Sequence, residues 1–186
     1  MTDNAAIEML GREHEIILRV VLGLHGLARH LREGRSTDAD LLLEAVIFMR
    51  EFADKCHHAK EEEILFPAMV AHGVPLHGCP LDALLHEHKE ARHLVGQLEE
   101  AAKAYHAGEP GSEGKVIAAI EPIERLYPEH IWKEDQMVFP MVERLVPAEA
   151  RRQIFAEFEE VEARNAPGTH ERFHHFAARL STAAGQ

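Results

Sequence analysis

The stretch CHHAKEEEILFPAM, from Cys56 to Met69, combines two adjacent histidines and three consecutive glutamates with an apolar block. A helix that serves only for packing does not need this many polar side chains beside its apolar face. His57 and Glu61 are four residues apart, so their side chains lie on the same face of a helix. The apolar members of that face are Met49, Ala53, Ile64 and Ala68. His57 and Glu61 are therefore predicted to point into the core.

The neighbouring polar residues are predicted to lie elsewhere on this helix. His58 is one residue further along, which rotates its side chain by about 100° on an α-helix. The upstream residues on its face are Glu51 and Asp54, so His58 is expected to face away from the apolar seam. Glu62 and Glu63 are expected on the flank or the outside.

A second copy of this pattern lies later in the chain and indicates an internal duplication. HHAKEEEILFP resembles HIWKEDQMVFP with an offset of 73 residues (57 to 130). The alignment places His57 on His130 and Glu61 on Glu134. Each half of the chain therefore supplies one His-x-x-x-Glu pair, and the repeat supports the predicted orientation of the first pair.

The duplication also aligns two single histidines. REHEIIL around His14 resembles HEHKEAR around His88 with an offset of 74 residues (14 to 88). His14 lies in the apolar seam between Leu10 and Ile17, and His88 interrupts its own seam in the same way. Because burying an unpartnered histidine costs free energy, both histidines are predicted to have a binding partner in the core.

Glycine- and proline-rich breakers divide the chain into helical segments, and no stretch shows the alternation of a strand. Helices are predicted over about 4–32, 38–72, 81–107, 115–145, 147–164 and 169–184, which makes the chain all-α. Pro122 and Pro128 are expected to cause kinks or irregular turns in the fourth helix.

Composition excludes several classes of partner. The 186 residues include 20 Lys plus Arg and 32 Asp plus Glu, and the net charge of −12 disfavours nucleic acid and anionic membranes. No apolar run approaches the roughly 20 residues of a membrane span, and the N-terminus lacks a cleavable signal. Cys56 and Cys79 do not form a disulfide framework, so a cytoplasmic protein with reduced thiols is expected. The one unusual figure is 15 histidines.

The inward-facing polar residues form a set suited to metal binding. Four imidazoles and two carboxylates converging in one core suit two metal ions bridged by the carboxylates. This mixture of imidazole and carboxylate favours iron, with manganese or zinc as possible substitutes. The predicted metal ligands are His14, His57, Glu61, His88, His130 and Glu134.

The sequence resembles the hemerythrin-like, or HHE cation-binding, domain over about residues 5–145. The resemblance rests on these motifs, on their order and offsets, and on the stretches KEE…LFP and HIWKED…FP. The resemblance implies an up-down four-helix bundle over residues 1–146 that holds a non-haem di-iron centre with the six ligands given above. Residues 147–186 resemble the C-terminal helical extension of some bacterial members, which is expected to pack on the bundle.

The sequence departs from the oxygen-carrying hemerythrins at one ligand position. Those proteins have a further histidine four residues before the one that matches His88, and Leu84 occupies that place here. Their last carboxylate lies five residues after its histidine, which corresponds to Asp135 rather than Glu134. The loss of an imidazole argues against reversible oxygen carriage. Possible replacement imidazoles are those of His77 and His86, and His170 on the last helix.

The leading functional hypothesis is a di-iron protein that binds or senses oxygen, nitric oxide or iron. The alternative is a di-iron oxidoreductase acting on peroxide or nitric oxide, and a third hypothesis is a storage or structural bundle stabilised by its metal. Cys56 is expected to be an inert buried thiol, and Tyr127 a packing residue with its hydroxyl near the centre. Met137 is expected to pack in the core. The oligomeric state stays open.

Overall fold

The computed structural model describes residues 3–78, 80–164 and 168–185. Within these ranges no residue forms a strand, which confirms the prediction of an all-α chain. Cys79 lies outside the described residues. The helical elements are α1 (Ala5–Arg32), α2 (Ala39–Phe48), the π-helical η1 (Met49–His58) and η2 (Glu61–Leu65), α3 (Phe66–Ala71), α4 (Pro80–His106), α5 (Ser112–Lys133), the π-helical η3 (Glu134–Val138), α6 (Phe139–Leu145), α7 (Ala148–Arg164) and α8 (Thr169–Ala183).

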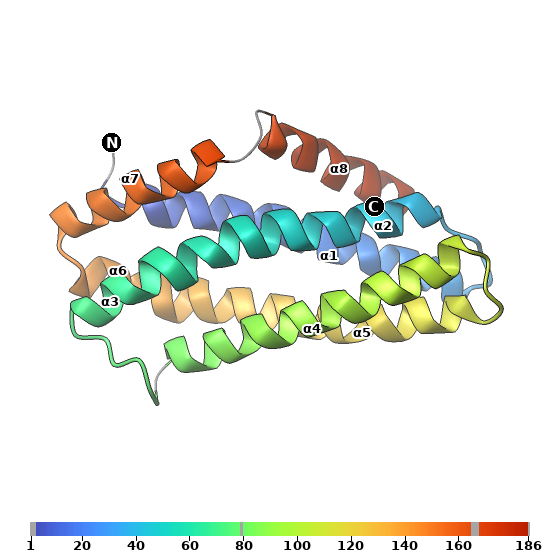
Figure 1. The fold of residues 1–186 in the computed structure, drawn as a ribbon, viewed down its shortest axis with the longest axis horizontal. Helices are drawn as coiled ribbons and strands as arrows, with labels where there is room; N and C mark the ends of the chain where they lie inside the picture. Colours follow the sequence, from blue (N-terminus) through green and yellow to red (C-terminus); the bar gives the residue numbers. More distant parts are fainter. Residues whose placement is uncertain (1–2, 79, 165–167, 186) are drawn as a thin grey trace.

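Four long helical rods lie side by side, and consecutive rods run in opposite directions (Figure 1). The first rod is α1, and the second is the continuous run from α2 to α3. The third rod is α4, and the fourth is the continuous run from α5 to α6. The shorter helices α7 and α8 lie along the outside of this bundle, where both contact α1. In the described part of the chain, no helix combines the length and apolar character that crossing a membrane requires.

Two π-helical turns interrupt the second and fourth rods at equivalent positions of the repeat. η2 begins at Glu61 and η3 at Glu134, 73 residues later, and each turn is followed by a proline at the start of the next helix. Proline lacks the N–H for an α-helical bond and clashes with the carbonyl four residues earlier, so a wider turn ahead of it relieves both problems. The irregular turn of the fourth rod therefore lies at η3, and α5 continues through Pro122 and Pro128.

The wider turns shift the phase of the residues that follow them. Met137 was predicted in the core, but its side chain is 42% exposed, and the neighbouring Val138 is fully buried in its place. In the second rod Leu65 is likewise fully buried, while Ile64 is only half-buried. An additional residue in the turn moves the buried position one residue along the chain, which is why the prediction for Met137 was wrong.

The core consists of two apolar clusters with a polar layer between them. Along α1, Leu10 belongs to one cluster and Ile17 to the other, and the buried His14 lies between them. Leu84 on α4 is fully buried and belongs to the same cluster as Leu10. The histidines and glutamates therefore occupy a layer that is closed at both ends by packed side chains.

Helix α8 approaches α1 closely because two glycines of α1 face it. A Cβ atom added at Gly23 would lie 2.6 Å from Cγ of Leu180, and one added at Gly26 would lie 2.4 Å from Cβ of Ala184. Neither position admits a larger side chain without displacing α8. Phe173 and Phe176 of α8 belong to the larger apolar cluster, so the last helix shares a core with the bundle.

Candidate metal centre

The structure brings all six predicted metal ligands together in the polar layer, with every side chain buried. They form two groups of four, and the ligand atoms of each group lie within 4.8 Å of one another. The groups share two glutamates, so they lie next to each other in the bundle. The first group is His14, His57, Glu61 and Glu134, and the second is Glu61, His88, His130 and Glu134.

The four imidazoles face one another in pairs through Nε2. The Nε2 atoms of His14 and His57 are 3.1 Å apart, and those of His88 and His130 are also 3.1 Å apart. Two imidazole nitrogens that each bind one metal at about 2.1 Å, roughly at right angles, lie about 3 Å from each other. The spacing of both pairs therefore fits two nitrogen ligands of a common ion.

The two glutamates provide the strongest indication of a missing cation. Both carboxylate oxygens of Glu61 and both of Glu134 are buried, and none forms a hydrogen bond with the described residues. The Oε2 atom of Glu134 lies 3.1 Å from Nε2 of His14, and its Oε1 atom lies 3.1 Å from Nε2 of His130. Because a buried carboxylate without hydrogen bonds is costly, a bound cation is the natural partner for these four oxygens.

The pKa values of the centre show how strongly its charges interact. Burial and the neighbouring charge of Glu134 raise the pKa of Glu61 well above its usual range. Burial would also raise the pKa of Glu134, but contacts with histidines, first His130, outweigh it and lower that pKa. Although burial opposes the charged imidazolium, nearby carboxylates raise the pKa of His14 to about 10 and that of His130 to about 9. A metal ion would take the place of these protons.

Each of the four histidines is oriented by a carboxylate on its other ring nitrogen. The four Nδ1–carboxylate distances are between 2.7 and 2.9 Å, and each fixes the ring with Nε2 towards the centre. Such partners raise the basicity of a metal-binding imidazole. The pairs are His14 with Asp135, His57 with Glu13, His88 with Glu62, and His130 with Glu87.

These four carboxylates also follow the repeat, and the sequence analysis did not identify them. Glu13 and Glu87 each immediately precede a ligand histidine, with the same offset of 74 residues (13 to 87). Glu62 and Asp135 each immediately follow a ligand glutamate, with the offset of 73 residues (62 to 135). Glu134, rather than Asp135, is therefore the inward carboxylate. The acidic residue next to each of four ligands, His14, Glu61, His88 and Glu134, carried the signal that could have revealed this outer shell.

Two lysines complete the outer shell, and their environments differ. Lys133 forms an ion pair with Glu87 and is partly exposed. Its repeat partner Lys60 is fully buried and forms ion pairs with both Glu13 and Glu162 of α7. The ammonium group of Lys60 therefore lies among a second group of potential metal ligands, Glu13, Cys56, Glu162 and His170, and supplies the positive charge there.

Cys56 and His170 do not belong to the central layer. Cys56 is buried, as predicted, and burial raises the pKa of its thiol to about 12. His170 forms an ion pair with Glu162 on the outer side of this network. His77 is 83% exposed and His86 is also exposed, so neither supplies an imidazole to the centre.

The predicted orientation of His58 was wrong. Its side chain is buried, and one of its ring nitrogens lies within 4.8 Å of ligand atoms of His88 and His130. Asp54, which had suggested an outward face, lies 3.5 Å from Nδ1 of His58 and is its partner. Two features explain the difference. The π-helical η1 rotates consecutive residues by less than an α-helix does, and a rod flanked by two neighbours buries a wide sector. His58 therefore brings a fifth imidazole next to those of His88 and His130.

Comparisons with known proteins agree with this arrangement. The family model described as the hemerythrin HHE cation binding domain matches residues 5–142. Uncharacterized protein Rv1995 of Mycobacterium tuberculosis and uncharacterized protein Mb2018 of Mycobacterium bovis are each 26% identical over 159 residues. The match covers 86% of this chain but only 62% of each relative. No solved structure matches the chain significantly.

Proposed function

The chain belongs to the hemerythrin HHE cation-binding family, and on this premise we propose that it holds two iron ions in the buried layer and binds or senses a small ligand there. The candidate small ligands are oxygen, nitric oxide or further iron. The observation that carries this proposal is the set of four buried, unbonded carboxylate oxygens of Glu61 and Glu134 between four inward-facing imidazoles. Two shared carboxylates suit a pair of neighbouring cations better than one.

We assign His14 and His57 to the first metal position and His88 and His130 to the second, with Glu61 and Glu134 shared between them. We add His58 to the second position because of its distance from His88 and His130. Five imidazoles with two carboxylates favour iron, and manganese or zinc are possible substitutes. The first position then has one protein ligand fewer than the second.

When bound, a pair of iron ions supplies redox-active centres with coordination positions open to a small molecule. The protein orients the imidazoles through the four outer carboxylates and excludes water with apolar side chains. Phe139 stacks on His14 with ring centroids 5.4 Å apart, and its repeat partner Phe66 lies against His88 at 6.1 Å. These two aromatic rings cover the centre symmetrically on the side of the cluster that contains Leu84.

The proposal is tested by metal analysis of full-length protein produced with ample iron, followed by optical spectra under nitrogen, air, nitric oxide and peroxide. We expect about two iron ions per chain and spectral changes with at least one of these molecules. One metal ion or none in intact, folded protein would contradict the di-iron assignment. Sustained consumption of peroxide or nitric oxide, rather than stoichiometric binding, would identify the oxidoreductase alternative.

A further inference from the structure

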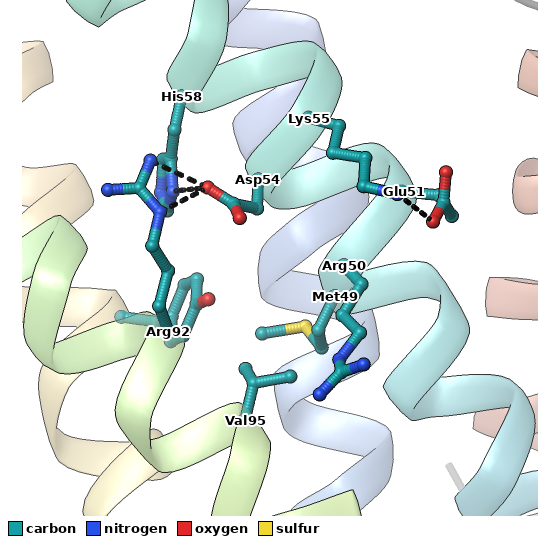
Figure 2. Close-up of a pocket in the computed structure, with 9 residues that line it drawn as sticks. Met49, Arg50, Glu51, Asp54, Lys55, His58, Arg92 and Val95 are labelled. Carbon is teal, nitrogen blue, oxygen red and sulfur yellow. Dashed lines mark hydrogen bonds and ion pairs between the residues drawn. The ribbon is translucent and has the colours of Figure 1, made fainter.

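A cavity of about 330 Å³ lies beside the second metal position, between η1 and α4. His58 belongs both to its lining and to the cluster with His88 and His130. Figure 2 shows His58 and Arg92 converging on the carboxylate of Asp54 at one side of the cavity. The lining thus places one candidate metal ligand next to a space that reaches the surface of the protein.

The internal repeat provides a reference for judging this cavity. The repeat aligns four of its lining residues with four that line another cleft. Arg92 and Val95 align with Leu18 and Val21 at an offset of 74 residues, and Glu51 and Lys55 align with Glu124 and Pro128 at an offset of 73. The apolar floor residue is conserved in character, since valine occupies both places. The glutamates Glu51 and Glu124 also match, but the two cationic residues do not, because leucine replaces arginine and proline replaces lysine.

The same asymmetry extends to the metal centre. The repeat partner of His58 is Ile131 (58 to 131), which is buried but offers no metal ligand. At these three positions one half of the repeat therefore has an imidazole, a guanidinium and an ammonium, and the other half has Ile131, Leu18 and Pro128. A merely structural role gives no reason for this difference, whereas a binding site on one side of the centre does.

The charges of the cavity favour an anion. Three cationic side chains and two carboxylates line it, although the whole chain has a net charge of −12. Arg92 forms ion pairs with Asp54 and with Glu62. Arg50 and Lys55 are 50% and 67% exposed, and they form ion pairs with Glu99 and Glu51. Exposed ion pairs of this kind contribute little stability, so both cations can turn towards a bound anion at small cost.

The size and floor of the cavity favour an organic molecule over a diatomic one. Its volume corresponds to roughly ten water molecules at about 30 Å³ each. Buried Met49, Val95 and Tyr127 form an apolar floor, and the charged groups of Arg50, Lys55 and Arg92 lie nearer the surface. This arrangement matches a molecule with a short hydrocarbon body and a charged head.

We propose that this cavity binds a small organic anion, such as a short-chain carboxylate, with its head at Arg92, Lys55 and Arg50 and its chain on the apolar floor beside His58. Binding of the anion does not depend on the proposed metal site. Only its consequence does, because the bound anion would occupy the approach to the second metal position. The anion is then a substrate or an effector of the metal centre.

The test uses iron-loaded, full-length protein with hexanoate as the probe, and acetate, hexylammonium and hexanol as matched comparisons. We expect calorimetry to show hexanoate binding at least about tenfold more tightly than the other three, because both the chain and the charge contribute. We also expect hexanoate to slow the binding of azide to the metal, followed by absorbance. Equal affinity for hexanoate and hexylammonium, or for hexanoate and acetate, would overturn the proposal.

Two variants localise the binding. Arg92→Leu introduces the residue of the equivalent cleft, and Lys55→Glu reverses a charge without contacting a metal ligand. Each should weaken hexanoate about tenfold, whereas Arg125→Leu, at an exposed position on α5, should not. Unchanged affinity in both cavity variants would refute the assignment. The same titration with metal-free protein separates the two proposals. If the protein takes up no iron but still binds hexanoate, the result supports the cavity and contradicts only the metal centre.

Discussion

The imidazole ring of His58 stacks on that of His88, with ring centroids 3.9 Å apart and 15° between the ring planes. His88 is one of the two histidines assigned to the second metal position, so the stacked pair places an additional imidazole beside that position. Burial lowers the pKa of His58 to about 4, even though Asp54 raises it, and the ring is therefore neutral at physiological pH. A neutral imidazole is the form that binds metal ions.

We expect His58→Ala to lower the iron content from about two ions to about one per chain. The second position would lose one of three imidazoles, while the first position would keep all of its ligands. His57→Ala should instead impair the first position, and His174→Ala, at an exposed site on α8, should change nothing. Iron analysis and Mössbauer spectra of the variants would check this. Two ions per chain in folded His58→Ala protein would restrict the ligand set to the original six residues.

The outer carboxylates provide a second, matched test. Glu13 accepts from Nδ1 of His57 at 2.8 Å, and Glu87 accepts from Nδ1 of His130 at 2.9 Å. Replacing either by glutamine should weaken metal binding by about 10- to 100-fold, because the oriented, more basic imidazole is lost. Glu13→Gln should act on the first position and Glu87→Gln on the second. Competition with a chelator would measure the affinities, and Glu100→Gln, an exposed change on α4, serves as the control.

The sequence was sufficient for the fold class and for the convergence of six buried histidines and glutamates because both depend on periodicity. The apolar seams located the helices, and the offsets between His14 and His88 and between His57 and His130 defined which polar residues point inward. The structure places these residues together, with Nε2 distances of 3.1 Å in both pairs. A duplicated pattern thus provided an internal check that a single helix could not have provided.

The remaining features depend on geometry that α-helical periodicity does not describe. His58 and Met137 were misplaced because each lies in a π-helical segment, where the phase differs from that of an α-helix. Glu162 reaches Lys60 from a helix that follows the bundle by sequence, so only the folded chain reveals the contact. The cavity beside His58 likewise depends on how η1 and α4 meet.

The two lysines of the outer shell should differ strongly in their contribution to stability. Lys60→Met would leave Glu13 and Glu162 without their shared cation in a buried place, which should cost about 3–5 kcal/mol. Lys133→Met removes a partly exposed ion pair with Glu87 and should cost about 1 kcal/mol or less. Urea unfolding of metal-free protein measures both values. Equal costs for the two variants would mean that α7 does not reinforce this side of the bundle.

Removal of the metal should destabilise the whole chain, because the buried layer would then retain carboxylate oxygens without hydrogen bonds and would lose the binding energy that only the folded state provides. A metal present at 100 times its dissociation constant stabilises the folded state by about 2.7 kcal/mol per site. For a chain of this length, each kcal/mol corresponds to roughly 2–4 °C in melting temperature, so the shift should be about 5–10 °C for one site. Calorimetry of iron-loaded and chelator-treated protein would measure it. The double variant Glu61→Gln with Glu134→Gln removes the charge that needs a cation, so its melting temperature should not respond to iron. Identical melts of the loaded and metal-free natural protein would show that the layer holds no tightly bound ion.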